Sequence, residues 1–338
     1  MARPRLHGLQ ALRGLAAVMV LVGHVIAEAE HYFGLPLPGD FFPWTRGVDI
    51  FFVISGFVVT LSAERFLNRP GAFLGRRLLR VAPLYFLFTT LMVLVLLTIP
   101  GGSKDTSLDP FQIISSYTFF PYERLDGRIA PVLSLGWTLN YEVFFYSLFA
   151  LCLALPRPLL AVSALLAGLG FIGVLVEFDS PQLTFWTNPI IMEFVFGILL
   201  ARMWMRRWRR PGVRLGVAIG LLGLALLAFL AGTGLPRVIA AGVPAAIIVA
   251  AGTVFWPNRP IWNLGLGDAS YALYLSHRFA LRAATLLLLP LLPATPLAAG
   301  AYVVVVCLLA LAFARLTHSY IEKPLMRALQ APPKELTA

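Results

Sequence analysis

The chain has 338 residues, of which 59% are hydrophobic and only 13% are charged, and its formal net charge is +11. Soluble globular domains carry about 25% charged residues, so this composition excludes a water-soluble domain and indicates an integral membrane protein. The positive charge does not indicate nucleic acid, because the basic residues lie in short loops between apolar runs. Cys152 and Cys307 lie within apolar runs that lack metal-ligand spacing, so we expect packing roles for both and no bound metal.

The apolar runs predict an all-α membrane protein with about ten transmembrane helices. A helix needs about 20 apolar residues to cross a hydrocarbon core of about 30 Å. The stretch 111–121 is too short to cross, so we expect an interfacial or re-entrant segment there. The runs that are long enough lie near 9–28, 46–63, 82–99, 134–154, 159–176, 188–205, 213–231, 237–256, 268–289 and 297–317.

The loop charges predict an orientation. Arginine and lysine gather at the N-terminus, after the second and sixth runs and in the C-terminal tail, whereas the alternate loops hold acidic residues. The positive-inside rule and an even number of spans then put both termini in the cytoplasm. We expect one membrane domain over 1–328 and a short cytoplasmic tail over 329–338. A cleaved signal peptide is the alternative for the first run, but it would discard Arg13 and His24.

Arg13 and His24 share one face of the first run. They lie eleven positions apart, which at about 100° per residue returns to within about 20° of the same direction, with an axial offset of about 16 Å. An ionisable group inside a span costs at least about 2.5 kcal/mol on insertion scales, so it usually faces a cavity or a partner. A snorkelling arginine and a structural histidine would explain either residue alone, but the pair favours a functional channel.

Asp49 lies about one turn inside the second run, at a depth in the hairpin similar to that of His24. A carboxylate beside an imidazole fixes its tautomer and raises its basicity, which makes Asp49 a candidate partner of His24. Capping of the helix N-terminus is the competing interpretation. We interpret the nearby Ser55 and Gly56 as a small-residue contact between helices.

The segment GRRLLRVAPLY places Arg77 and Arg80 three positions apart, on one helical face. Two guanidinium groups in this arrangement suit phosphate recognition. Ordinary positive-inside charge would also explain them, and we accept that explanation for Arg65 and Arg69.

Glu142 lies about two turns inside the fourth run, in the segment SLGWTLNYEVFFY. A buried carboxylate without a function is rare at this depth, so Glu142 is a candidate catalytic residue. Trp137, Asn140 and Tyr141 flank it. These neighbours form either an interfacial aromatic belt or a wall on which a sugar could stack.

More ionisable residues lie in later runs. Glu193 is in the sixth run, and the ninth contains SYALYLSHRFALR with His277, Arg278 and Arg282. We expect Glu193 to pair with one of these cations. Tyr271 and His277 are candidate substrate contacts, and His277 is either a second acid–base group or a structural residue.

In their order and spacing, these segments resemble the acyltransferase 3 family of integral-membrane acyltransferases from about Leu9 to Met326. The weaker elements are EFVFGILLA, SYALYLSH and IEKP. Thr138 stands where the family more often has serine, which keeps the hydroxyl. The most specific elements are LQALRGLAAVMVLVGH, GVDIFFVISGF, the Arg-x-x-Arg pair followed by Pro83 and Tyr85, and WTLNYEVFFY.

The resemblance implies a ten-helix fold, a cytoplasmic acyl-CoA donor and a hydroxyl acceptor, usually a sugar of the bacterial surface. Some family members continue into an extracytoplasmic esterase-like domain, and we expect this chain to act alone or to hand its product to a partner. The functional positions that the resemblance implies are Arg13, His24, Arg77, Arg80 and Glu142.

These observations lead to one mechanistic hypothesis. An O-acyltransferase of the bacterial inner membrane moves an acyl group, expected to be acetyl, from acyl-CoA to a cell-surface glycan or related glycoside. His24 is the general base, oriented by Asp49 or Glu142, or it carries the acyl group itself. The three arginines hold the phosphates of acyl-CoA. The alternatives are a transporter or flippase with a proton relay, and a binding or sensor protein without turnover.

Overall fold

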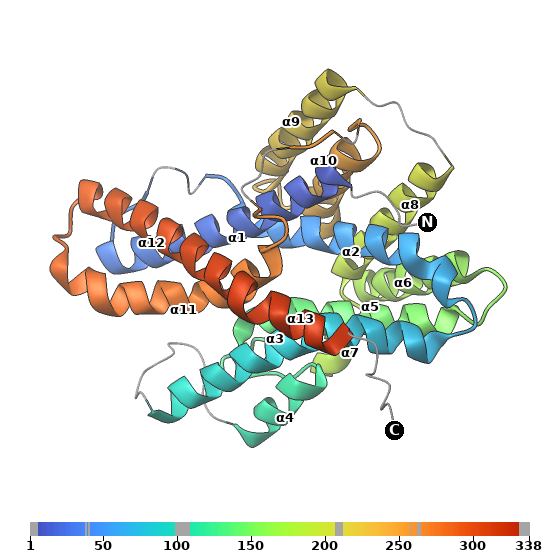
Figure 1. Ribbon diagram of the computed structural model, residues 1–338, viewed down its shortest axis with the longest axis horizontal. Coiled ribbons are helices and arrows are strands. Elements are labelled where there is room, and N and C mark those ends of the chain that lie inside the picture. Colours follow the sequence, from blue (N-terminus) through green and yellow to red (C-terminus); the bar gives the residue numbers. More distant parts are fainter. Residues whose placement is uncertain are drawn as a thin grey trace, which may run out of the picture.

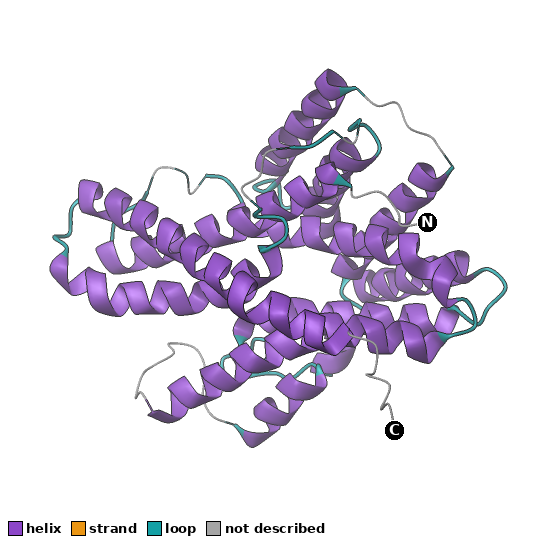
Figure 2. Ribbon diagram, in the orientation of Figure 1, coloured by secondary structure: helices purple, strands orange, loops and turns teal. Residues whose placement is uncertain are grey.

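The computed structural model describes residues 6–37, 39, 41–98, 109–206, 212–257, 259–261 and 265–330. These residues are mainly helical and form no strand, and their one β-pairing is an isolated bridge between Glu123 and Ile129 (Figure 2). The predicted all-α architecture is therefore confirmed. The arginines at 207, 209 and 210 and the tail from 331 onward lie outside the described residues.

The helices form an elongated bundle, in which α1 and α2 run through the centre and α9 lies at the periphery (Figure 1). Two π-helical turns, Val238–Gly242 and His318–Glu322, lead into the tenth and thirteenth helices. In chain order, the α-helices of the described residues are α1 (His7–Phe33), α2 (Gly47–Ala63), α3 (Pro70–Thr98), α4 (Pro110–Thr118), α5 (Trp137–Cys152), α6 (Pro158–Leu175), α7 (Pro181–Trp186), α8 (Met192–Met205), α9 (Val213–Leu230), α10 (Val243–Thr253), α11 (Ser270–Leu288), α12 (Pro296–Thr317) and α13 (Lys323–Gln330).

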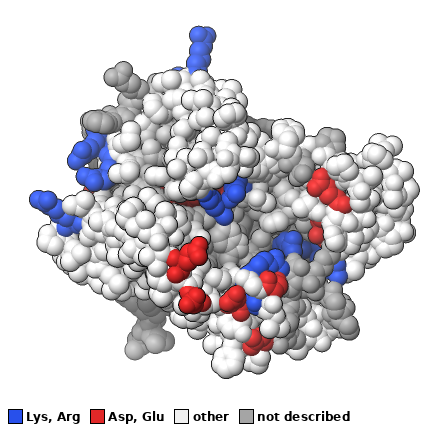
Figure 3. All heavy atoms as spheres, turned by 180° about the vertical axis from the view of Figure 1, so that it is seen from behind, with Lys and Arg blue, Asp and Glu red and all other residues white. Residues whose placement is uncertain are grey.

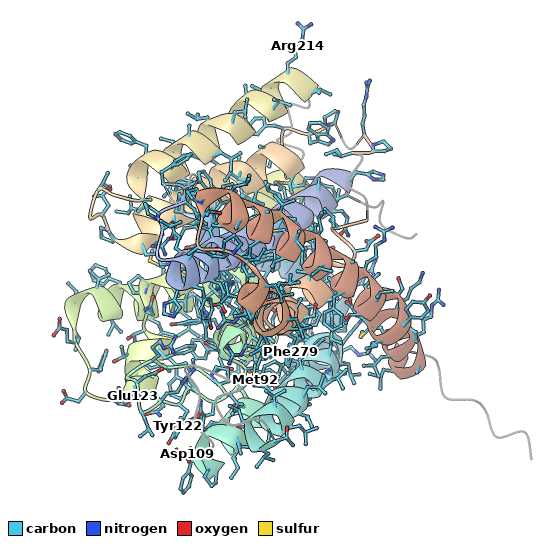
Figure 4. All side chains as sticks on the ribbon, turned by 90° about the vertical axis from the view of Figure 1, so that its left-hand side faces the viewer. Met92, Asp109, Tyr122, Glu123, Arg214 and Phe279 are labelled. Atoms are coloured by element: carbon cyan, nitrogen blue, oxygen red, sulfur yellow. The ribbon has the colours of Figure 1, made fainter. Side chains whose placement is uncertain are left out.

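Several helix ends follow from local sequence. Asp109 caps α4 by accepting a hydrogen bond from a backbone N–H of the first turn, and it also accepts one from the hydroxyl of Tyr122. Both residues lie at the edge of the bundle (Figure 4). Thr295 caps α12 in the same way, and proline occupies the first turn of both helices, where a missing N–H costs nothing. Gly34 ends α1 in the left-handed conformation, with φ of 65°.

Among the described residues, eight helical segments are long and apolar enough to cross a membrane. The other two predicted spans, 134–154 and 237–256, correspond to α5, which has 16 residues, and to the shorter apolar helix Val238–Thr253; neither is among the eight. The stretch predicted to be interfacial or re-entrant, 111–121, overlaps α4, which has nine residues. The eight segments are His7–Phe33, Trp44–Phe66, Pro70–Thr98, Pro158–Leu175, Pro181–Met205, Val213–Leu230, Ser270–Leu291 and Pro296–Leu329.

The outer surface is apolar. Only 17% of the apolar stretch of α6 and of α9 is buried, and Phe171 and Phe229 are among the exposed side chains. Figure 3 shows a face that is mostly uncharged, with charged side chains gathered around a central hollow. Such an exposed apolar surface is unfavourable in water and favourable against lipid, so the chain is a multi-pass membrane protein.

The α2 helix is the centre of the bundle, with 78% of its apolar stretch buried. It packs directly against α8 through glycines: a Cβ at Gly56 would lie 2.2 Å from the carbonyl oxygen of Phe194, and one at Gly197 would lie 2.1 Å from that of Val53. The predicted small-residue contact is thus confirmed for Gly56.

Candidate functional site

A cavity of about 460 Å³ lies between α1, α2, α3, α5, α11 and the C-terminal segment. Five arginines and two glutamates contribute to its walls, together with apolar side chains, so its charged lining is predominantly positive. A cavity of this kind suits an elongated polyanion with an apolar part. The charged lining residues are Arg13, Arg65, Arg76, Arg77, Arg80, Glu142 and Glu322.

The structure therefore brings together the three arginines predicted to bind phosphate. Arg13 comes from α1, and Arg77 and Arg80 come from one face of α3. Arg65, which we had interpreted as ordinary loop charge, also borders the cavity.

Arg77 is held in place by its surroundings. Its guanidinium group donates a hydrogen bond to the hydroxyl of Ser62. Its central carbon lies 5.6 Å from the ring centroid of Phe73 and 5.9 Å from that of Tyr146. A guanidinium group stacked on aromatic rings keeps its in-plane N–H donors available for a ligand such as phosphate.

Glu142 is also in the cavity wall, on α5. The hydroxyl of Tyr146, one helical turn further along, donates a hydrogen bond of 3.0 Å to its carboxylate. The Ser55 hydroxyl lies 3.5 Å from the same tyrosine oxygen, and Ser55 borders the cavity. Ser55 thus does not belong to the helix contact that we predicted for it, because it points toward α5 while Gly56 faces α8.

Two tyrosines of α11 connect the cavity walls. The Tyr271 hydroxyl donates a 2.5 Å hydrogen bond to the carbonyl of Val81 in α3. The Tyr274 hydroxyl donates to the carbonyl of Leu135, and the Thr138 hydroxyl lies 3.0 Å from the Tyr274 oxygen. These bonds fix α11 against α3 and α5, which carry Arg77 and Glu142.

His24 has a different partner from the predicted one. Its Nδ1 lies 3.0 Å from Nε2 of His277, and the two rings stack with centroids 5.1 Å apart. The prediction that Asp49 or Glu142 orients His24 is therefore wrong. The reason is that α11, and not α2 or α5, covers this face of α1. Neither histidine lines the cavity, but the ring of His277 lies 6.3 Å from that of Tyr274, which does.

Asp49 instead forms an ion pair with Arg237, at the start of the π-helical turn before α10. Both carboxylate oxygens accept from the guanidinium group, each at 2.9 Å, and Asp49 is fully buried. The buried Glu193 lies beside this pair. The predicted pairing of Glu193 with a cation of α11 is therefore wrong, because α8 faces α2 and α10 at this level.

The remaining candidates on α5 point away from the arginine cavity. The half-buried ring of Trp137 lies 5.7 Å from the Arg237 guanidinium carbon. Tyr141 stacks on Phe185, with centroids 3.7 Å apart. Asn140 is buried, and its side-chain oxygen has no hydrogen-bond partner among the described residues. Hence two polar regions border α5: the cavity at Glu142, and the Asp49–Arg237 ion pair near Trp137.

Sequence reasoning missed several residues of these regions, among them Arg237 and Glu322. Arg237 had one signal, since it is a lone basic residue before an apolar run on the side predicted to lack basic residues. Glu322 belongs to the IEKP segment of the resemblance, to which we had assigned no role. In the structure it borders the cavity and accepts a 2.8 Å hydrogen bond from Nδ1 of His318.

Comparison with known proteins identifies the class. A family model described as an acyltransferase domain matches residues 6–315. The chain is 34% identical over 266 residues to the exopolysaccharide production protein ExoZ of Rhizobium meliloti (strain 1021), covering 76% of this chain and 80% of that protein. It is 28% identical over an alignment of 376 residues to the acyltransferase MdmB of Streptomyces mycarofaciens, covering 96% and 92% of the two chains.

A third relative is the O-acetyltransferase OatA of Staphylococcus aureus (strain NCTC 8325 / PS 47), which is 28% identical over 228 residues, covering 60% of this chain and 36% of that protein. No solved structure matches the chain. The family match spans most of the sequence, and the predicted resemblance is confirmed. The chain belongs to the acyltransferase 3 family and is a membrane-embedded acyltransferase.

Proposed function

We propose that the chain transfers an acetyl group from acetyl-CoA to a hydroxyl group of a cell-surface glycan or a related glycoside. The observation that carries this proposal is the cavity lined by five arginines in a chain of an acyltransferase family. Coenzyme A presents a diphosphate and a ribose phosphate, joined to an uncharged arm that ends in the thioester. The arginines of the lining suit the phosphates, and the apolar walls suit the arm.

The acceptor follows from the relatives and from the second polar region. One relative is named for exopolysaccharide production and another as an O-acetyltransferase. Near Arg237, the half-buried Trp137 offers an apolar ring face and Asn140 an unpaired amide oxygen. We place the acceptor sugar at the N-terminal end of α5, beside Trp137 and Asn140, with Tyr141 as part of the supporting wall.

The reaction needs a base for the acceptor proton. The acceptor hydroxyl oxygen bonds to the thioester carbonyl carbon, the carbon–sulfur bond breaks, and the CoA thiolate leaves. His24 takes the hydroxyl proton and passes it to the thiolate. The spacing from Arg13 to His24 corresponds to about 16 Å along α1, so phosphate binding and proton transfer take place at opposite ends of the site. Glu142 lies in the cavity wall together with the arginines.

The membrane setting is part of the proposal. We infer a bacterial inner-membrane protein with about ten crossings, in which α5 and the Val238–Thr253 helix supply the crossings beyond the eight long segments. Residues 1–328 form the acyltransferase domain. The arginine-rich end of the cavity faces the cytoplasm, in accordance with the positive-inside rule, so the donor enters from there and the acceptor from the other side.

Binding of the donor tests this assignment. Purified protein in lipid nanodiscs is titrated with CoA and with dephospho-CoA, which lacks the ribose phosphate, by isothermal titration calorimetry. Loss of one charge-assisted hydrogen-bonding group costs about 1.5–3 kcal/mol, so Arg77→Ala should weaken CoA binding by about 10- to 100-fold. Dephospho-CoA should bind the wild type more weakly than CoA.

Arg214→Ala is the matched control, since Arg214 is exposed on α9 and projects away from the bundle (Figure 4). Its CoA affinity should equal that of the wild type. Equal CoA affinity in wild type and Arg77→Ala would contradict the assignment of the cavity to the donor.

A further inference from the structure

The hydrogen bonds around the two histidines have a defined direction. Nδ1 of His277 lies 3.0 Å from the carbonyl oxygen of Leu273, one helical turn earlier in α11. A carbonyl oxygen only accepts, so Nδ1 of His277 carries the proton. In a neutral imidazole the other nitrogen is then an acceptor, and Nε2 of His277 accepts from Nδ1–H of His24 at 3.0 Å.

The same hydrogen bonds determine the tautomer of His24. With the proton on its Nδ1, the lone pair is on its Nε2, which is the form a base needs. Two neutral rings satisfy the hydrogen bonds that lead from the Leu273 carbonyl through His277 to His24, and the Val20 carbonyl, one helical turn earlier in α1, is a further acceptor for the His24 ring. Among the described residues, no carboxylate bonds to either ring, and the nearby charged group is Arg278 on α11.

We propose that His277 is a positioning residue, which holds His24 in the tautomer with a free Nε2 and thereby prepares it to accept the acceptor hydroxyl proton. This inference rests on the proposed function, since it assigns the tautomer of the proposed base. His277 is fully buried, and its bond to Leu273 ties its ring to the α11 backbone. Its orientation is therefore set by the helix and does not depend on a flexible carboxylate.

In the proposed step, His24 gains and loses one proton while His277 keeps its own. The acceptor proton moves to Nε2 of His24, which becomes an imidazolium ion, while Nδ1–H stays bonded to His277. When that proton passes on to the CoA thiolate, the neutral pair is restored. His277 gains and loses no proton, which distinguishes a positioning role from that of a second acid or base.

Two substitutions separate positioning from packing. His277→Phe fills a similar volume without an acceptor, whereas His277→Gln offers an amide oxygen near the position of Nε2 that can accept from His24. CoA release from acetyl-CoA is measured in nanodiscs with methyl β-glucoside as acceptor. At metal sites, removal of the group that orients a ligating histidine costs about 10- to 100-fold, and we expect kcat of His277→Phe to fall by a similar factor.

The KM for acetyl-CoA should stay within about twofold of wild type, because the arginines are untouched, and His277→Gln should recover most of kcat. Added to His24→Ala, His277→Phe should cause no further loss, since the two residues act as one unit. A wild-type kcat in His277→Phe would overturn the proposal. Equal loss in the phenylalanine and glutamine variants, with KM raised in both, would also overturn it, because packing would then be the cause.

A readout without turnover keeps the two proposals separate. The chain has five histidines, so 15N-histidine spectra of the protein in lipid can be assigned by difference with His24→Ala. We expect His24 protonated at Nδ1 in the wild type. A spectrum with His24 protonated at Nε2, in protein that turns over acetyl-CoA, would overturn the positioning role alone. An Nδ1-protonated His24 in protein that never consumes acetyl-CoA would support the geometry and contradict the proposed function.

Discussion

Arg237 donates a hydrogen bond to each carboxylate oxygen of Asp49, from a position 188 residues further along the chain. The carboxylate is fully buried, whereas the arginine side chain is 34% exposed. The buried Glu193 lies beside the pair. The two partners are therefore not equivalent: without Arg237, the carboxylates of Asp49 and Glu193 would keep Arg46 as a nearby cation but would lose the guanidinium group that bonds to Asp49.

This asymmetry predicts different stabilities for the two single variants. Arg237→Met should lower the free energy of unfolding by about 3 kcal/mol or more, because it leaves a buried charge without its cation. Asp49→Asn should cost less, since the arginine can reach solvent. The thermal midpoint in detergent, followed by tryptophan fluorescence, should be higher for the double variant than for Arg237→Met alone. Losses that simply add would show that the two side chains are energetically independent.

Tyr146 should affect catalysis through Glu142. Tyr146→Phe removes the hydroxyl that donates to the Glu142 carboxylate, while it keeps the ring that contacts Arg77. A hydrogen bond to a charged group is worth about 1.5–3 kcal/mol, so kcat/KM for acetyl-CoA should fall at least about tenfold.

A buried tyrosine outside the cavity provides the control for that measurement. The Tyr302 hydroxyl lies 2.9 Å from the hydroxyl of Thr285, and neither residue lines the cavity. Tyr302→Phe should keep kcat/KM within about twofold of wild type. Similar losses in both variants would mean that tyrosine hydroxyls matter only for stability.

The contact between α2 and α8 should not tolerate a single added methyl group. Gly56→Ala places a Cβ at 2.2 Å from the backbone oxygen of Phe194, so the two helices must move apart. Gly168 in α6 has open space around it, and there alanine should be neutral or stabilising by about 0.5–1 kcal/mol. The thermal midpoint should fall for Gly56→Ala and stay level or rise for Gly168→Ala. A similar small shift in both would contradict direct backbone packing.

The sequence predicted the features that depend on local pattern. Long apolar runs predict helices in lipid whatever their neighbours are, and eight of the predicted runs appear as long apolar helices. Arg77 and Arg80 share a face by helical period alone, and the short connection to α2 places that face near the centre of the bundle. Their convergence with Arg13 was therefore predictable.

The partners of His24 and Asp49 were not predictable in this way. Hairpin spacing gives the depth of a residue, but not the helix that packs against its face. Asp49 faces Arg237, and His24 faces His277, which lies 253 positions later. Only the packing of α8, α10 and α11 around the first hairpin decides these pairs, and that packing carries no local signal.

The proposed site binds acetyl-CoA through arginines at one end and uses His24 at the other end to transfer its acetyl group. The most direct measurement is release of CoA thiol from acetyl-CoA by purified protein in nanodiscs, comparing wild type, His24→Ala and Arg77→Ala at equal folded concentration. We expect turnover by the wild type, a loss of kcat by about 100-fold or more in His24→Ala, and mainly a raised KM in Arg77→Ala. Full activity in a well-folded His24→Ala variant would show that His24 is not the base of the reaction.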